Sequence, residues 1–229
     1  MTPEEIPDWR ASERRRLIAA REALDASMLE SLRRRIDDHL ERSFPGLATT
    51  TLAFCWPIRG EYDARPLLQR HRDRGAVTAL PVVVAPRQPL VFRAWHPGVT
   101  LASGPLGIPY PADSDQVVPR VVLLPMVGWD GAGFRLGYGA GFFDRTLASM
   151  SPKPTAIGVS YELARLATIH PQSWDIPMDW VVTERGVYRR DPGGLALLGE
   201  ASGGQPGKMA SPVCYADEIV PRPSSAPQP

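Results

Sequence analysis

Cysteine is scarce in this sequence of 229 residues, where only Cys55 and Cys214 occur. They form no Cys-x-x-Cys pair and no Cys/His spacing, so neither a disulfide scaffold nor a zinc site is indicated. Neither sign of charge prevails, because the formal net charge is +1. No overall field therefore attracts nucleic acid or a membrane surface, and we expect neither as a partner.

Long hydrophobic runs are also missing. The longest, at residues 81–85 and 121–127, are far too short to span a bilayer. The first residues are acidic and lack the apolar segment of a signal peptide. A cytoplasmic location is expected by elimination.

The remaining composition is typical of a globular protein, with 43% hydrophobic and 22% charged residues. Helical spacing of leucines predicts a helix over residues 10–42. Further elements are expected as strands at 49–54, 77–84, 89–94, 117–127, 155–160, 180–183 and 187–189, and as helices at 63–75 and 142–149. This alternation predicts a three-layer α/β/α fold with a mostly parallel sheet, in which 121–127 is central and buried on both sides.

Three parts of the chain differ in composition. We expect an N-terminal arm at residues 1–9, one α/β domain at 10–190 and a tail at 191–229. The tail is rich in Pro, Gly and Ser, which predicts a mobile segment.

The most informative stretch follows the predicted central strand. Gly137, Gly139 and Gly141 alternate just before a predicted helix. Their backbone N–H groups and the helix dipole suit a bound anion. Arg135 adds a fork-shaped cation for phosphate, and Asp144 adds a hard oxygen ligand for Mg²⁺. The stretch is neither a dinucleotide fingerprint nor a Walker A loop, so generic motifs identify it no further.

The string RLGYGAGFFDR at residues 135–145 resembles the signature of the 5-formyltetrahydrofolate cyclo-ligase family, and the resemblance extends over roughly residues 10–185. Residues 10–14, followed by Leu17 and Arg21, are similar to a basic helix of that family that contacts ATP. The Arg-Gly-Glu61 turn is similar to its folate-contacting segment, and residues 175–184 follow its closing pattern.

The resemblance implies an ATP- and Mg²⁺-dependent enzyme that cyclises 5-formyltetrahydrofolate, a reduced folate, to 5,10-methenyltetrahydrofolate. It also implies a fold like that of the NagB/RpiA/CoA-transferase group. The implied catalytic residues are Arg135 and Asp144, and the implied metal ligands are Asp144 and Asp175. The implied substrate-binding residues are Trp56, Glu61 and Tyr138. The implied ATP-binding residues are Arg10, Arg14, Arg135, Leu136, Gly137, Tyr138, Gly139, Ala140, Gly141, Phe142 and Phe143.

The sequence departs from the family pattern at four places. Arg10 replaces a lysine, Tyr110 an acidic residue and Ala164 a glutamine, and Trp174 stands in an altered segment at residues 169–175. Two alternatives therefore stay open. One is a divergent member acting on another pterin-like or formylated substrate, and the other is a nucleotide- or folate-binding regulator without turnover.

Several side chains also allow a plainer interpretation. Glu61 suits the start of a helix, Trp56 suits packing, and Asp175 suits the capping of a turn. His39 and His71 lie in predicted helices without metal spacing, and we expect them at the surface.

Overall fold

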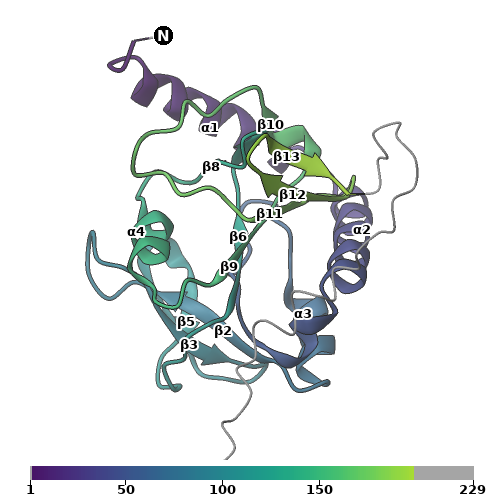
Figure 1. Cartoon of the computed structure of the whole chain (residues 1–229). Coiled ribbons are helices and arrows are strands. Elements are labelled where there is room, and N and C mark those ends of the chain that lie inside the picture. Colours follow the sequence, from purple (N-terminus) through teal and green to yellow (C-terminus); the bar gives the residue numbers. More distant parts are fainter. Residues whose placement is uncertain (1, 199–229) are drawn as a thin grey trace, which may run out of the picture.

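The structure is a computed structural model that describes residues 2–198 (Figure 1). Its main sheet is built from β1 Thr51–Ala53, β2 Val77–Val82, β3 Val91–Trp95, β6 Val121–Pro125, β9 Thr155–Val159, β11 Trp180–Val182, β12 Val187–Asp191 and β13 Gly194–Leu197. The strand order is β13-β12-β11-β9-β6-β1-β2-β3. The five strands from β2 to β11 are parallel, whereas β3, β12 and β13 pair antiparallel at the two edges.

Helices cover both faces of this sheet, which confirms the predicted α/β fold. The helices are α1 Ile6–Glu22, α2 Ala26–Ser43, α3 Arg65–Arg72 and α4 Phe142–Ser149. In Figure 1, α4 lies on the left of the sheet, and α2 and α3 lie on the right. α1 lies at one end of the sheet, where Leu17 and Ile18 pack on Val127.

The central strand β6 shows why both faces must be covered. Val121 and Leu123 pack in the core cluster that contains residues of α2 and α3. Val122 and Leu124 point the other way, into the cluster that contains Leu147 of α4. A strand in the middle of a parallel sheet has no solvent face, so a continuous apolar run is stable there. The predicted central position of this segment is therefore confirmed.

Shorter elements connect the main ones. They are β4 Leu101–Ser103, β5 Pro109–Pro111, β7 Gly128–Asp130, β8 Arg135–Leu136 and β10 Arg165–Leu166, with 3-10 helices η1 Pro45–Thr49, η2 Pro105–Gly107 and η3 Glu162–Ala164. β7 pairs with both β8 and β10. Residues 128–136, which follow the central strand, therefore form a hairpin, and the predicted glycine loop begins at Gly137.

The structure divides one predicted helix in two and adds a strand beyond residue 190. The helix expected over 10–42 is divided into α1 and α2, because the Asp25 side chain accepts a hydrogen bond from the N–H group of Met28 and caps a new helix. The domain expected to end at 190 continues through β13, which pairs with β12. The rest of the predicted tail, residues 199–229, lies outside the described residues. At the other end, the predicted arm at residues 1–9 contains the first turn of α1, which begins at Ile6.

The expected surface position of His71 was also wrong. This α3 side chain is only 1% exposed, and neither ring nitrogen has a hydrogen-bond partner among residues 2–198. It faces the core because Leu67 and Leu68 lie on the same side of the short helix.

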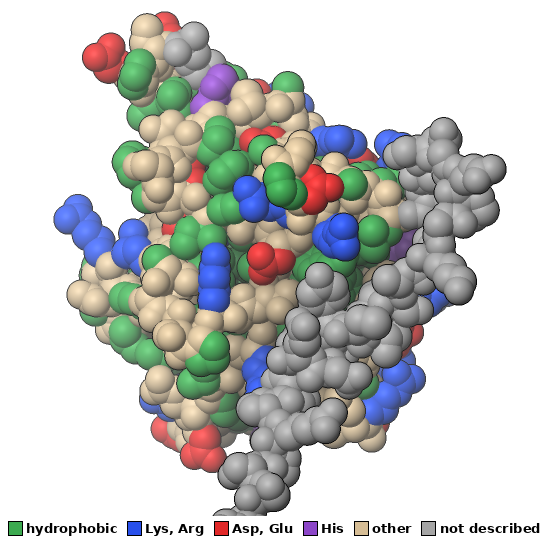
Figure 2. Space-filling model, in the orientation of Figure 1, with side chains coloured by type: hydrophobic (Ala, Val, Ile, Leu, Met, Phe, Trp, Pro, Cys, Tyr) green, Lys and Arg blue, Asp and Glu red, His purple; other side chains and the backbone are tan. Residues whose placement is uncertain are grey.

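The described surface carries mixed charge. Figure 2 shows basic and acidic side chains interspersed on the face in view, without a large patch of one sign. Within residues 2–198, no helix is both long enough and apolar enough to cross a bilayer.

Candidate active site

A cavity of about 290 Å³ lies at the carboxyl ends of β1, β2 and β6. This is the edge of a parallel sheet where ligands commonly bind. Its walls come from α1, the segment after β1, residues 104–110, the glycine loop at 137–141 and the segment that carries Asp175. Every residue that the sequence predicted for ATP, substrate or metal binding lines this one cavity.

The glycine loop owes its shape to two positive backbone angles. Gly139 and Gly141 have φ values of +101° and +65°, which side-chain-bearing residues rarely adopt. Gly141 also caps the N-terminus of α4. A Cβ atom built on Gly137 meets no atom within 4 Å. The loop therefore presents open backbone to the cavity, as close approach by an anion requires.

Arg14 connects α1 to this loop through a hydrogen bond. Its Nε atom donates a 2.7 Å hydrogen bond to the carbonyl of Gly137. Its Cζ atom lies 3.4 Å from where a Cβ atom on Gly139 would stand. Burial lowers the pKa of Arg14, and the nearby charge of Arg10 lowers it further. A guanidinium group remains charged under these conditions, so Arg14 brings a cation to the loop.

Arg135 and Asp144 form a buried ion pair. The nitrogen–oxygen distance is 3.0 Å, and the Arg135 side chain is 4% exposed. Burial lowers the pKa of Arg135, whereas the Asp144 charge opposes this shift. Arg135 also donates to the carbonyl of Ile176, whose N–H group donates to Asp144. The pair thereby joins α4 to the segment that follows Asp175.

Arg10 is bound to the segment that carries the second carboxylate. Its guanidinium group donates to the carbonyls of Ile169 and His170, at 3.0 and 2.9 Å, and to Asp175. The N–H group of Gln172 donates to the same carboxylate at 2.7 Å. A lysine has a single point charge and cannot make this fork-shaped set of contacts.

Two carboxylates thus face the cavity, each paired with an arginine. Among the described residues, no group of three or more His, Cys, Asp or Glu side chains could hold a metal ion. Mg²⁺ keeps several water ligands and binds phosphate oxygens, so one or two protein carboxylates are sufficient. Two cavity carboxylates are therefore enough, in number and in ligand type, for a magnesium ion that arrives with a nucleotide.

Glu61 lies on the opposite wall, in contact with the glycine loop. Its carboxylate accepts hydrogen bonds from the Tyr138 hydroxyl, at 2.7 Å, and from the N–H group of Ile58, at 3.1 Å. Burial raises the pKa of Glu61, while Tyr138, Ile58 and the charge of Arg21 lower it. Nearby, the guanidinium group of Arg65 lies 4.6 Å from the ring centre of Trp56. A buried carboxylate beside an aromatic ring suits a flat, polar-edged ligand.

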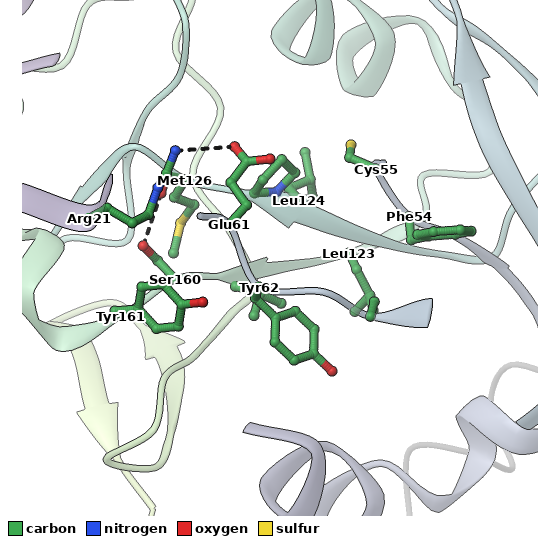
Figure 3. A pocket seen from close by; sticks show the side chains of 13 residues that line it. Arg21, Phe54, Cys55, Glu61, Tyr62, Leu123, Leu124, Met126, Ser160 and Tyr161 are labelled. Carbon is green, nitrogen blue, oxygen red and sulfur yellow. Dashed lines mark hydrogen bonds and ion pairs between the residues drawn. The ribbon is translucent and has the colours of Figure 1, made fainter. Parts of the chain in front are cut away.

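A second, much smaller cavity lies behind Glu61 (Figure 3). Its volume is about 20 Å³, which is enough for one water molecule. Figure 3 shows Arg21 and Glu61 facing each other at its edge, and Cys55 borders both cavities. The sequence predicted no role for Cys55 and placed Arg21 only in the basic helix, without a contact of its own. The only signal for Arg21 was its place in the arginine series of α1, seven residues after Arg14.

The departures from the family pattern fall in different places. Tyr110 and Trp174 line the large cavity, and Trp174 is 67% exposed. Ala164 is buried in the core cluster with Trp129 and Leu147 and does not line the cavity. Arg10 lines the cavity as well. Three of the four substitutions can therefore touch a ligand, whereas Ala164 can act only through packing.

Comparisons with known proteins show the family of this chain. The sequence profile of the 5-formyltetrahydrofolate cyclo-ligase family matches residues 7–184. The chain is 32% identical to the 5-formyltetrahydrofolate cyclo-ligase of Escherichia coli (strain K12), over 63% of this chain and 83% of that protein. It is 31% identical to the enzyme of the same name from Mycolicibacterium smegmatis, over 57% of this chain and 72% of that protein.

Solved structures show the same architecture. The 5,10-methenyltetrahydrofolate synthetase of Aquifex aeolicus superposes with a TM-score of 0.69 and 27% identity, covering 85% of this chain and 99% of that one. The corresponding protein of Mycoplasma pneumoniae has a TM-score of 0.63 at 17% identity, over 76% of this chain and 98% of that one, and shows the fold alone. The profile match over most of the chain shows that the protein is an enzyme of the 5-formyltetrahydrofolate cyclo-ligase family.

Proposed function

We propose that the enzyme uses ATP and Mg²⁺ to convert 5-formyltetrahydrofolate into 5,10-methenyltetrahydrofolate, with release of ADP and phosphate. The observation that carries this proposal is that one cavity is lined by a phosphate-type glycine loop, two carboxylates and a buried Glu61. A nucleotide phosphate chain and a second, flat substrate can meet in such a cavity.

The nucleotide part of the proposal rests on the loop and its cations. Backbone N–H groups of residues 137–141 surround the phosphates, at the N-terminus of α4. Arg14 and Arg135 neutralise negative charge beside the loop. Bound through Asp144 and Asp175, Mg²⁺ would neutralise the phosphate oxygens and orient them. Binding of the ion would exchange the arginine contacts of these carboxylates for metal and phosphate contacts.

The substrate part of the proposal rests on Trp56 and Glu61. The indole ring packs on the pterin ring, and the carboxylate accepts N–H hydrogen bonds from the pterin edge. Tyr138 connects this carboxylate to the glycine loop. The two substrates are thereby held at a fixed separation, which is the main protein contribution to a phosphoryl transfer.

The reaction then proceeds in two steps. The formyl oxygen attacks the γ-phosphorus atom, the bond from phosphorus to the ADP oxygen breaks, and an imidate phosphate forms. N10 of the folate attacks the activated carbon and loses its proton, and the carbon–oxygen bond breaks with departure of phosphate. No side-chain nucleophile is needed, in keeping with a site made of glycines, arginines and carboxylates.

An absorbance assay tests the proposal directly. Methenyl-folate should form from 5-formyltetrahydrofolate when both ATP and Mg²⁺ are present, and omission of either should abolish its formation. If the protein consumes ATP with another compound but forms no methenyl-folate from 5-formyltetrahydrofolate, the proposed substrate is refuted. Turnover without Mg²⁺ would refute the proposed metal.

A second candidate substrate class follows from the cavity wall. Tyr110 and Trp174 line the cavity and replace residues usual in the family. They favour a divergent member that acts on another pterin-like or formylated compound. ATP consumption with such a compound, without methenyl-folate formation from 5-formyltetrahydrofolate, would support this second candidate.

A further inference from the structure

Arg21 is a buried cation that borders the small cavity and contacts two residues of the large one, Glu61 and Tyr138. It lies in the last turn of α1, and its side chain is 4% exposed. Its guanidinium group donates to the carbonyl of Arg59 at 2.8 Å and to the hydroxyl of Tyr138 at 2.9 Å. It also lies 3.7 Å from the Glu61 carboxylate, as Figure 3 shows. One side chain thus contacts two separate segments of the chain, the turn at residues 59–61 and the glycine loop.

The turn before Glu61 is pressed against the end of α1. Arg59 and Gly60 both have positive φ angles, of 52° and 71°. A Cβ atom on Gly60 would stand 3.3 Å from the carbonyl oxygen of Arg21. The close contact leaves Arg21 and the turn little freedom to move apart, so the position of α1 determines where Glu61 stands.

The groups around Glu61 leave Arg21 as the cation that contacts it. Tyr138 and Ile58 donate hydrogen bonds to the carboxylate. The Cys55 thiol lies on the cavity wall, and burial and the Glu61 charge raise its pKa, so it stays neutral and adds no charge. The Tyr161 phenol also borders the small cavity, and burial raises its pKa to about 12, so it is neutral as well. Burial alone would favour a protonated Glu61, and the Arg21 charge opposes this.

We propose that Arg21 is a positioning residue for the cyclisation: it keeps Glu61 a charged acceptor and holds it at a fixed distance from Tyr138 of the glycine loop. The inference rests on the proposed function, in which Glu61 accepts N–H hydrogen bonds from the folate. Arg21 itself lies behind Glu61 and acts through it. Its effect should therefore appear in folate binding and in the pH dependence of that binding.

The test compares Arg21→Gln with Arg16→Gln, an exposed arginine of the same helix that pairs only with Glu13. KM for 5-formyltetrahydrofolate and KM for MgATP are measured from about pH 5 to about pH 9. Arg21→Gln should raise the folate KM about tenfold or more at neutral pH, because Glu61 loses its fixed partner. The KM for MgATP should change less than about twofold, and Arg16→Gln should match wild type.

The pH profile separates a charge effect from a merely structural one. Folate binding is lost as pH falls through the pKa of Glu61, since a protonated carboxyl is a poorer acceptor. Removal of the Arg21 cation raises that pKa, so the midpoint of the loss should move up by about one pH unit. Arg21→Lys keeps the charge and should return the midpoint to its wild-type position. It cannot reach both Arg59 and Tyr138, so its folate KM should stay about threefold or more above wild type.

The results of these variants can overturn the role of Arg21 or that of Glu61 separately. A wild-type folate KM or an unmoved midpoint in Arg21→Gln would overturn the role of Arg21. If Arg21→Gln does not fold, Arg21→Lys carries the test, and an unchanged KM or a shifted midpoint there would overturn it. Glu61→Gln should raise the folate KM and remove the acid-side transition. If Glu61→Gln binds folate as wild type does, the proposed function of Glu61 fails, which is a separate result from failure of Arg21 alone.

Discussion

The hydroxyl group of Tyr138 donates a 2.7 Å hydrogen bond to the carboxylate of Glu61, a residue 77 positions earlier in the chain. This contact joins the glycine loop to the segment after β1. The two parts of the cavity that we assign to phosphate and to folate therefore share a wall.

Replacement of Glu61 by alanine should weaken folate binding while leaving ATP binding near wild type. The pterin N–H donors would lose their acceptor, at a cost of roughly 1–3 kcal/mol, or about tenfold in affinity. Titration of 5-formyltetrahydrofolate and of ATP against both proteins measures this. Glu4→Ala, at the exposed start of the chain, is the control. Equal folate binding by wild type and Glu61→Ala would contradict the assignment.

Arg135→Ala should reduce kcat/KM strongly, because a buried charge-assisted contact to phosphate is lost. The expected cost in transition-state stabilisation is about 2–4 kcal/mol. The unpaired Asp144 should also lower the melting temperature. Steady-state kinetics and thermal unfolding record the two effects, with Arg34→Ala, an exposed side chain of α2, as the control. A kinetic loss below about threefold would show that Arg135 does not contact the phosphates.

Asp144→Asn and Asp175→Asn should each raise the Mg²⁺ concentration needed for half-maximal activity. An amide oxygen is a weaker ligand than a carboxylate, and we expect a shift of about tenfold or more. Activity at fixed ATP and varied Mg²⁺ measures the shift, and Asp73→Asn, on the exposed end of α3, should show none. If only one of the two variants responds, the carboxylates do not share the ion.

Restoring the usual family residue should have different effects at two positions. Ala164→Gln places a longer amide in the buried core and should destabilise the protein by about 1–3 kcal/mol. Tyr110→Glu changes the cavity wall and should alter the folate KM with little effect on stability. Thermal unfolding together with kinetics separates them. A large change in folate KM in a stable Ala164→Gln protein would be inconsistent with its position in the core.

His71 should make the protein sensitive to acid. Burial lowers the pKa of His71 below its usual value of 6.5, so the unfolded chain binds a proton more readily than the folded one. Stability is then fully present above about pH 6.5 and is lost as pH falls toward the lower folded pKa. His71→Leu should flatten this loss in urea unfolding curves, and exposed His96→Ala should not. An unchanged pH slope in His71→Leu would rule out His71 as the cause.

Local signals in the sequence were enough for the central elements. The apolar run of β6 can be stable only between two covered faces, and the glycines before α4 mark its start at Phe142. The family resemblance then named the cavity residues, because each belongs to a short motif with fixed spacing. Their convergence on one cavity followed from the parallel sheet, whose strand ends meet at one edge.

Features that depend on distant contacts were missed. The proline and glycines just before Leu195 read as the start of a tail, but pairing with β12 makes Gly194–Leu197 a strand. His71 looks like a surface residue because its burial depends on what packs against α3. Arg21 is one of many arginines in the sequence, and only the positions of Tyr138 and Glu61 in space distinguish it. The break at Asp25 did carry a local signal, a capping residue, which the long helical pattern concealed.

The spacing of three arginines along α1 determines which segments of the chain they can contact. Arg10, Arg14 and Arg21 lie along one stripe of a helix with 3.6 residues per turn, and they contact the Asp175 segment, the glycine loop and the Glu61 turn in that order. α1 thus helps to fix the spacing of these three segments. One inserted residue between Arg14 and Arg21 would rotate the far end by about 100° and turn Arg21 away from Glu61. Exposed side chains of this helix are free to vary, whereas the number of residues between its arginines is fixed.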